Sequence, residues 1–156
     1  MARVLIIGYG NPLRGDDSVG WEIAKRLARL VQDEAVEVLA LNQLTPELSE
    51  PISEVELVVF IDASHAGKPG SWTCETVEPN ATSSHTLGHN LTPMSLLAYA
   101  QNIFKASPRA LLVSVAGESF DCRPELTPSA AAALPAVEQF VRETVTRAGQ
   151  RRSRDR

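Results

Sequence analysis

Short apolar segments alternate along the chain with longer segments in which apolar residues recur at helical spacing. The short segments are rich in β-branched residues, as expected for strands that are buried on both faces of a parallel sheet. They lie at residues 4–7, 36–41, 57–61 and 110–116. The longer segments predict amphipathic helices. These are expected at 18–31, in a short stretch after Thr45, from Thr92 to about Lys105, and from about Thr127 to Arg147.

This alternation predicts a single doubly wound α/β domain, with a mostly parallel sheet and helices on both faces. Residues 75–77 follow a Gly-Lys-Pro-Gly turn at 67–70 and predict one short antiparallel strand at the edge of the sheet. Pro135 is expected to kink or divide the last helix, because proline lacks the N–H that a helix needs. We expect the domain to span residues 1–148 and residues 149–156 to form a solvated, basic C-terminal tail.

The composition fits one compact domain without crosslinks. Of the 156 residues, 44% are hydrophobic, which suffices for a core of ordinary size. Cys74 and Cys122 are far apart and form no CxxC motif, so we expect each to be a buried, small apolar residue in a reducing cytoplasm. The first apolar run is too short for a signal peptide or a membrane span, so we expect no membrane association.

The charge pattern argues against nucleic-acid binding. The net charge is -4, only 5% of the residues are aromatic, and the basic cluster at 151–156 has no aromatic residues between its arginines. Proteins that bind single strands combine positive charge with aromatic stacking platforms. We therefore expect no nucleic acid among the partners.

Acidic residues mark the places where the first and third predicted strands end. The first strand runs into the loop GYGNPLRGDDSVG, which carries Asp16 and Asp17 just before a helix, and Asp62 follows the third strand. Asp16 or Asp17 could cap that helix. In a flavodoxin-like strand order, however, strands one and three are neighbours, which would bring Asp62 close to Asp17.

A histidine from the segment before the helix at Thr92 completes a candidate metal site. His85 and His89 both lie in this segment. Two carboxylates and an imidazole that converge at strand ends suit a divalent transition metal and leave coordination positions open. The residues alone do not decide between the two histidines.

Two other kinds of site fit the sequence less well. The GxGxxG pattern of dinucleotide-binding loops starts at Gly8 but has Leu13 in place of its third glycine, and no acid follows the second strand at 41–43. No serine lies in a GxSxG motif. Ser64 and His65 are sequence neighbours, which point to opposite faces of a strand, and we expect His65 to be a surface residue.

Several motifs together resemble the endopeptidases that mature nickel-iron hydrogenases. They are VLIIGYGNPLRGDDSVGWEIAKRL, VVFIDAS, HNLTPMSLLAYA, LVSVAGESFD and RPELTPSAAAALP, in this order along the chain. The resemblance extends over nearly the whole sequence up to the basic tail. It implies the same α/β fold and a proteolytic activity.

The resemblance also implies a particular ligand set. In such proteases the metal is bound by an acid in the first loop, an aspartate at the end of the third strand, and a histidine before the next helix. These positions correspond to Asp17, Asp62 and His89, because the spacing from His89 to Leu96 matches the family and His85 comes one helical turn too early. Several relatives carry glutamate at the position of Asp17.

The implied reaction is a single cut that removes a C-terminal extension from the large-subunit precursor after nickel insertion. Asp17, Asp62 and His89 would then bind the Ni²⁺ of the precursor, with Zn²⁺ or Cd²⁺ as possible substitutes. The metal could act on the scissile carbonyl or on water, or Asp17 or Asp16 could act as general base. The alternative function is a nickel-sensing or scaffold protein for hydrogenase assembly that does not cut.

Overall fold

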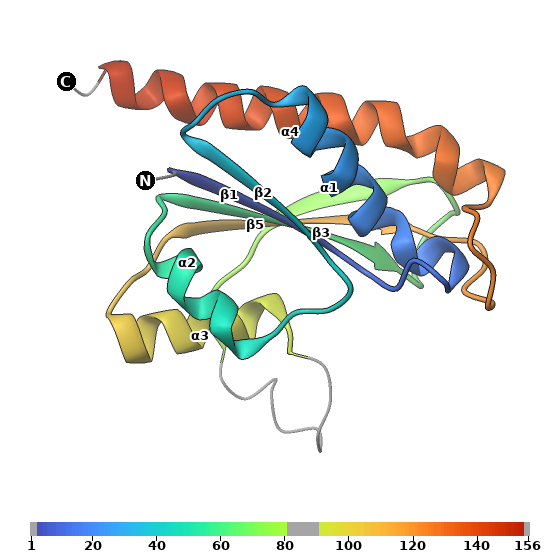
Figure 1. Ribbon diagram of the computed structural model, residues 1–156, viewed down its shortest axis with the longest axis horizontal. Helices are drawn as coiled ribbons and strands as arrows, with labels where there is room; N and C mark the ends of the chain where they lie inside the picture. Colours follow the sequence, from blue (N-terminus) through green and yellow to red (C-terminus); the bar gives the residue numbers. More distant parts are fainter. Residues whose placement is uncertain (1–2, 81–90, 155–156) are drawn as a thin grey trace.

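Strands from all parts of the chain form one sheet. The protein is described by a computed structural model that covers residues 3–80 and 91–154, with side chains as far as Arg151. The strands are β1 (Val4–Tyr9), β2 (Val36–Leu41), β3 (Leu57–Ser64), β4 (Trp72–Thr76) and β5 (Arg109–Ala116). Their order is β2-β1-β3-β5-β4, with every pair parallel except β4 and β5 (Figure 1). The structure confirms that strands one and three are neighbours and that one antiparallel strand lies at the edge of the sheet.

Helices cover both faces of the sheet. They are η1 (Gly15–Ser18), α1 (Val19–Leu30), η2 (Pro46–Leu48), α2 (Ser49–Ser53), α3 (Pro93–Phe104) and α4 (Pro128–Arg154). Helices α1 and α4 lie on one face, and α2 and α3 lie on the other (Figure 1). The predicted α/β fold class is therefore confirmed.

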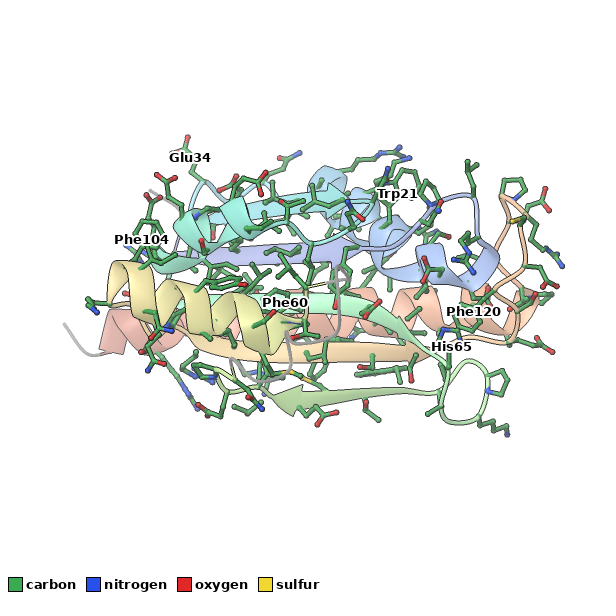
Figure 2. The ribbon with its side chains drawn as sticks, turned by 90° about the horizontal axis from the view of Figure 1, so that it is seen from below. Trp21, Glu34, Phe60, His65, Phe104 and Phe120 are labelled. Atoms are coloured by element: carbon green, nitrogen blue, oxygen red, sulfur yellow. The ribbon has the colours of Figure 1, made fainter. Side chains whose placement is uncertain are left out.

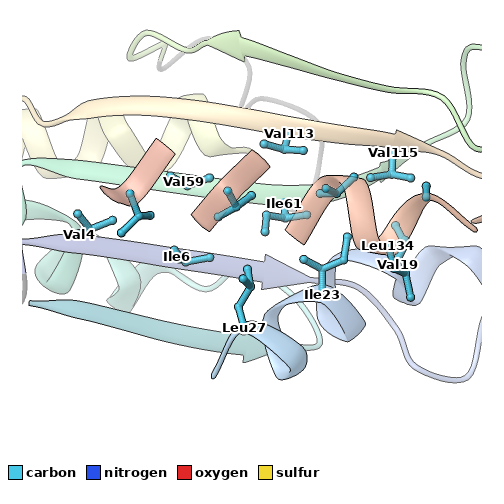
Figure 3. Close-up of a cluster of buried hydrophobic side chains, with 14 of the residues drawn as sticks. Val4, Ile6, Val19, Ile23, Leu27, Val59, Ile61, Val113, Val115 and Leu134 are labelled. Carbon is cyan, nitrogen blue, oxygen red and sulfur yellow. The ribbon is translucent and has the colours of Figure 1, made fainter. Parts of the chain in front are cut away.

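The apolar strands supply two cores, one on each face. Along β3, Val59 and Ile61 face α1 and α4, whereas Val58 and Phe60 face α2 and α3. The first core appears in Figure 3. This two-sided burial explains why the strand segments are continuously apolar rather than alternating.

Helix α4 is longer than predicted and is not divided. Pro135 lies inside it, and the helix continues to Arg154, so residues 149–154 extend the helix instead of leaving it. Val137, Val141 and Val145 recur at a spacing of four residues and are buried against the sheet. This apolar stripe continues beyond Pro135 and holds the helix on the sheet, which offsets the one hydrogen bond that proline removes.

Two further expectations are corrected by the structure. Strand β3 does not end before Asp62 but continues to Ser64, and Asp62 pairs in register with Ser114 of β5. Cys74 is half-buried against the first core, but Cys122 is exposed, so the expectation that both are buried is wrong for Cys122. None of the helices in the described residues is long and apolar enough to cross a membrane.

Candidate functional site

The loop between β1 and α1 folds back closely on the strand ends. A Cβ atom at Gly10 would lie 1.8 Å from the carbonyl oxygen of Asp17, and one at Gly20 would lie 2.2 Å from the carbonyl oxygen of Ile61. Only glycine permits such close contact between backbones. The backbone N–H of Asn11 donates a hydrogen bond of 2.8 Å to Oδ2 of Asp17. The loop thus holds the carboxylate of Asp17 beside the ends of β1 and β3.

Asp17 and Asp62 line the same cavity. It has a volume of about 660 Å³ and lies at the carboxyl ends of β1, β2 and β3, where ligands bind in open α/β sheets. Residues 42–44, which follow β2, form one part of its wall, and residues 91–93 at the start of α3 form another. The side chain of Thr92 caps α3 by accepting from the backbone N–H of Ser95 at 3.1 Å. Two acids that are 45 positions apart in the sequence therefore face one site.

The third predicted ligand cannot be placed. His85 and His89 lie in 81–90, outside the described residues. Leu91, two residues after His89 in the sequence, lines the cavity. Among the described residues, no three histidine, cysteine or acidic side chains lie close enough together to hold a metal ion. The role of His89 stays a prediction.

Burial changes the acid–base properties of Asp62. Loss of solvent raises its pKa to about 6, and the negative charge of Asp17 acts in the same direction. Hydrogen bonds from the Tyr9 hydroxyl and from the backbone N–H of Ala63, at 2.7 Å, offset part of this rise. The pKa of Tyr9 is in turn raised well above its ordinary value by burial and by Asp62. A cation between the two carboxylates would remove their repulsion.

Asp16 points away from the cavity and holds the loop before α4. Its side chain is fully buried and accepts hydrogen bonds from the backbone N–H groups of Glu118 (2.7 Å), Ser119 (3.2 Å) and Thr127 (2.8 Å), and from the Thr127 hydroxyl (2.7 Å). Burial alone would raise its pKa, but these hydrogen bonds outweigh burial and lower it. Both oxygens are in use, so Asp17 is the carboxylate of this loop that is available to a ligand.

The helix-capping interpretation of the two aspartates is wrong. In the described part of the chain, no side chain caps η1 or α1. His65 is exposed, as predicted, and its ring stacks on Phe120 with a centroid distance of 3.8 Å (Figure 2). Of the causes that act on the pKa of Asp62, His65 is the smallest and lowers it, whereas burial is the largest and raises it.

Sequence reasoning missed three polar contributions to the cavity. These are the Tyr9 hydroxyl, the Arg14 side chain and the amides of Asn42 and Gln43. Tyr9 could have been found, because Gly8 pairs in register with Ile61, which makes Tyr9 the neighbour of Asp62. Arg14 and the two amides lie in loops, where no periodicity indicates which way a side chain points.

Replacing Tyr9 by phenylalanine is expected to raise the pKa of Asp62 above its value of about 6. The variant lacks the hydroxyl that stabilises the charged carboxylate, and a hydrogen bond to a charged group is worth enough to shift the pKa by about one unit or more. Carboxyl-carbon NMR titration measures this pKa directly. Tyr99→Phe, on α3, is the control and should leave it unchanged. An unaltered Asp62 pKa in Tyr9→Phe would contradict the assigned hydrogen bond.

Comparison with solved structures identifies the fold over nearly the whole chain. The hydrogenase maturating endopeptidase HybD from E. coli superimposes with a TM-score of 0.77 at 22% identity over 94% of both chains. A hydrogenase 2 maturation peptidase from a Thaumarchaeota archaeon gives 0.71 at 25% identity, over 92% of this chain and 98% of the other. The [NiFe] hydrogenase maturation protease HycI from Thermococcus kodakarensis gives 0.72 at 26% identity over 91% of both chains. No protein-family model and no curated protein matches the sequence.

The fold is that of the α/β endopeptidases named above, and the chain carries an acidic cavity at its strand ends. The solved structures that share this fold at 25% and 26% identity are both maturation enzymes of hydrogenases. Over nearly its whole length the chain is similar in fold to solved hydrogenase maturation proteases.

Proposed function

We propose that this protease removes a C-terminal extension from the large-subunit precursor of a nickel-iron hydrogenase after nickel has been inserted. The observation that carries the proposal is the convergence of Asp17 and Asp62 on one cavity. A volume of about 660 Å³ lies within the range of sites that enclose small ligands, and it gives room for a short stretch of extended peptide.

Nickel in the precursor would be the feature that the enzyme recognises. Carboxylate and imidazole ligands suit borderline ions such as Ni²⁺, and Zn²⁺ or Cd²⁺ could take its place. Asp17, Asp62 and His89 would supply three ligands, leaving coordination positions for cysteines of the precursor or for water. Asp17 and Asp62 line the same cavity, and the charge of Asp17 adds to the rise that burial causes in the pKa of Asp62, which supports a role in cation binding. The enzyme would thereby cut only precursor that already carries its metal.

The residues around the cavity would orient the two carboxylates and take part in the cleavage step. Tyr9 and the backbone N–H of Ala63 orient the Asp62 carboxylate through hydrogen bonds, and the N–H of Asn11 orients Asp17. The nickel would polarise the scissile carbonyl or a water molecule, or Asp17 would accept a proton from that water as general base. A substitution that removes the charge of Asp17 without changing its size tests whether Asp17 is needed as a metal ligand or as a general base.

Substitution of Asp17 tests the proposal. Asp17→Glu is expected to retain partial cleavage, because it keeps the charge and lengthens the side chain by only one methylene. Asp17→Asn is expected to lower the cleavage rate much further, because an amide oxygen is a weak ligand and accepts no proton. The assay is mass spectrometry of the precursor, which detects loss of the extension.

Each variant is compared on nickel-loaded and on nickel-free precursor. Wild-type enzyme should cut only the loaded form. Equal cleavage of both forms would refute recognition of nickel while leaving the protease activity itself in place. Equal rates for Asp17→Asn and Asp17→Glu would refute the role of this carboxylate.

A further inference from the structure

A second concave site lies at the opposite end of the sheet, beneath helix α4. It is a cleft of about 230 Å³ whose rim carries three arginines, Arg109, Arg147 and Arg151. Its floor is mainly apolar and includes Leu57, Leu111 and Phe140. Leu57 and Arg109 are the first residues of β3 and β5, so the cleft lies at the amino ends of the strands. In Figure 1 the C-terminal part of α4 lies at the end of the sheet where β1 begins.

The charge of the cleft comes from its arginines. No acidic residue is among the described residues that line the cleft. A salt bridge joins Arg26 of α1 to Glu138 of α4, away from the cleft. The chain as a whole is acidic, with a net charge of -4, so a cluster of three arginines is not a consequence of composition. The sequence 147–156 has five arginines, Arg147 and Arg151 among them, and one aspartate.

Stability of the helix does not account for this cluster. Arg147 and Arg151 lie one turn apart, where two like charges disfavour the helix. The helix dipole favours cations only in the last turn, which includes Arg151, but Arg147 lies more than one turn before the end of α4 at Arg154. Arg109 belongs to a strand and gains nothing from the dipole. The positions of Arg109 and Arg147 therefore favour a ligand over a structural role.

We propose that this cleft binds an acidic segment of a partner protein, with an apolar side chain of that segment seated on its floor. The arginine rim would pair with carboxylates, which guanidinium groups bind in a bidentate manner. Leu57, Leu111 and Phe140 would cover the apolar side chain. A small inorganic anion would contact the arginines of the rim but not the apolar floor. The volume of the cleft, about 230 Å³, is enough for one side chain but not for a larger part of a folded protein.

The cleft is separate from the catalytic cavity. Leu57 begins β3 and Asp62 lies five residues further along it, which corresponds to roughly 16 Å of extended strand. The two sites also face opposite sides of the sheet, because Leu57 packs with α1 and α4 whereas the cavity includes the start of α3. A partner bound at the cleft would leave the cavity open to the scissile segment.

Fluorescence anisotropy with a labelled acidic peptide tests the proposal. The probe is a fluorescein-labelled glutamate peptide with one central phenylalanine, titrated with the full chain at low and at physiological ionic strength. Arg109→Gln and Arg147→Gln are each expected to weaken binding by at least about threefold, and added salt should weaken wild-type binding further. Arg29→Gln, which removes one exposed charge from α1, is the matched control and should bind like the wild type.

Four results would overturn the proposal. The first three are absence of peptide binding at low salt, equal weakening by Arg29→Gln, and tighter binding of a single-stranded oligonucleotide through the same arginines. Replacing the central phenylalanine of the probe by glycine should also weaken binding, since the apolar floor would then lie empty. Equal binding of the two peptides would reduce the cleft to a general anion site and contradict the stated partner chemistry. Circular dichroism of each variant verifies that the fold is retained.

Discussion

Replacing Asp62 by alanine is expected to reduce cleavage of the precursor by at least about 100-fold. Asp62 lies in the cavity, is held by hydrogen bonds from Tyr9 and Ala63, and would be one of only three protein ligands to nickel. A site with two ligands left would no longer hold the metal and the scissile bond in a reactive arrangement. His89→Ala is expected to have the same effect. The measurement is the initial rate of release of the extension from nickel-loaded precursor.

Two substitutions serve as controls for this result. Cys74→Ala removes a thiol on β4, outside the cavity, and should cleave at close to the wild-type rate. His85→Ala should do the same, because the family spacing assigns the ligand role to His89. Circular dichroism should report an intact fold for all four variants. Full processing by His89→Ala, with loss of processing by His85→Ala, would reverse the assignment of the histidine.

Replacing Asp16 by asparagine is expected to destabilise the protein by about 2–4 kcal/mol. The carboxylate accepts four hydrogen bonds in a fully buried position, and an amide would turn its own N–H groups toward at least one of these donors. For a domain of this size the loss corresponds to a fall in melting temperature of roughly 5–12 °C. Thermal unfolding followed by circular dichroism measures it.

The pH dependence of this loss provides a second readout. The pKa of Asp16 lies below its ordinary value in the folded protein, because its hydrogen bonds outweigh the opposing effect of burial. Its stabilising effect is therefore present above the ordinary pKa of 3.8 and is lost as the pH falls through the lower pKa of the folded state. The melting temperatures of wild type and Asp16→Asn should converge in acid. Glu34→Gln, at an exposed acid, is the control, and an equal effect of both substitutions would contradict the anchoring role of Asp16.

Most of the fold could be predicted from the sequence because its strands are buried on both faces. Continuous apolar segments with β-branched residues mark β1, β2, β3 and β5 within a few residues of their observed bounds. The misplaced boundaries have a common cause, which is that tertiary contacts extend an element beyond its apolar pattern. Pairing with β5 continues β3 to Ser64, and the buried stripe of α4 carries that helix through Pro135.

The site was predictable in its position but not in its details. Topology alone places Asp17 and Asp62 at neighbouring strand ends, because β1 and β3 are adjacent. The different environments of the two loop aspartates were not predictable. Asp16 and Asp17 are adjacent in the sequence, yet one is buried against residues more than 100 positions away and the other faces the cavity. The two aspartates differ because the loop 117–127 supplies hydrogen-bond donors to Asp16 alone.

The position of the Asp62 carboxylate depends, through the pleat of β3, on the number of residues in that strand. Val58, Phe60 and Asp62 share the face toward α2 and α3, whereas Val59 and Ile61 face α1 and α4. Deleting one residue between Leu57 and Ile61 would turn Asp62 under α4, into an apolar layer, and would bring Ala63 to the cavity in its place. Substitutions in this strand can therefore be tolerated wherever volume is kept, but changes of length cannot. Natural variation in length should thus be confined to the loops, such as the one between α1 and β2.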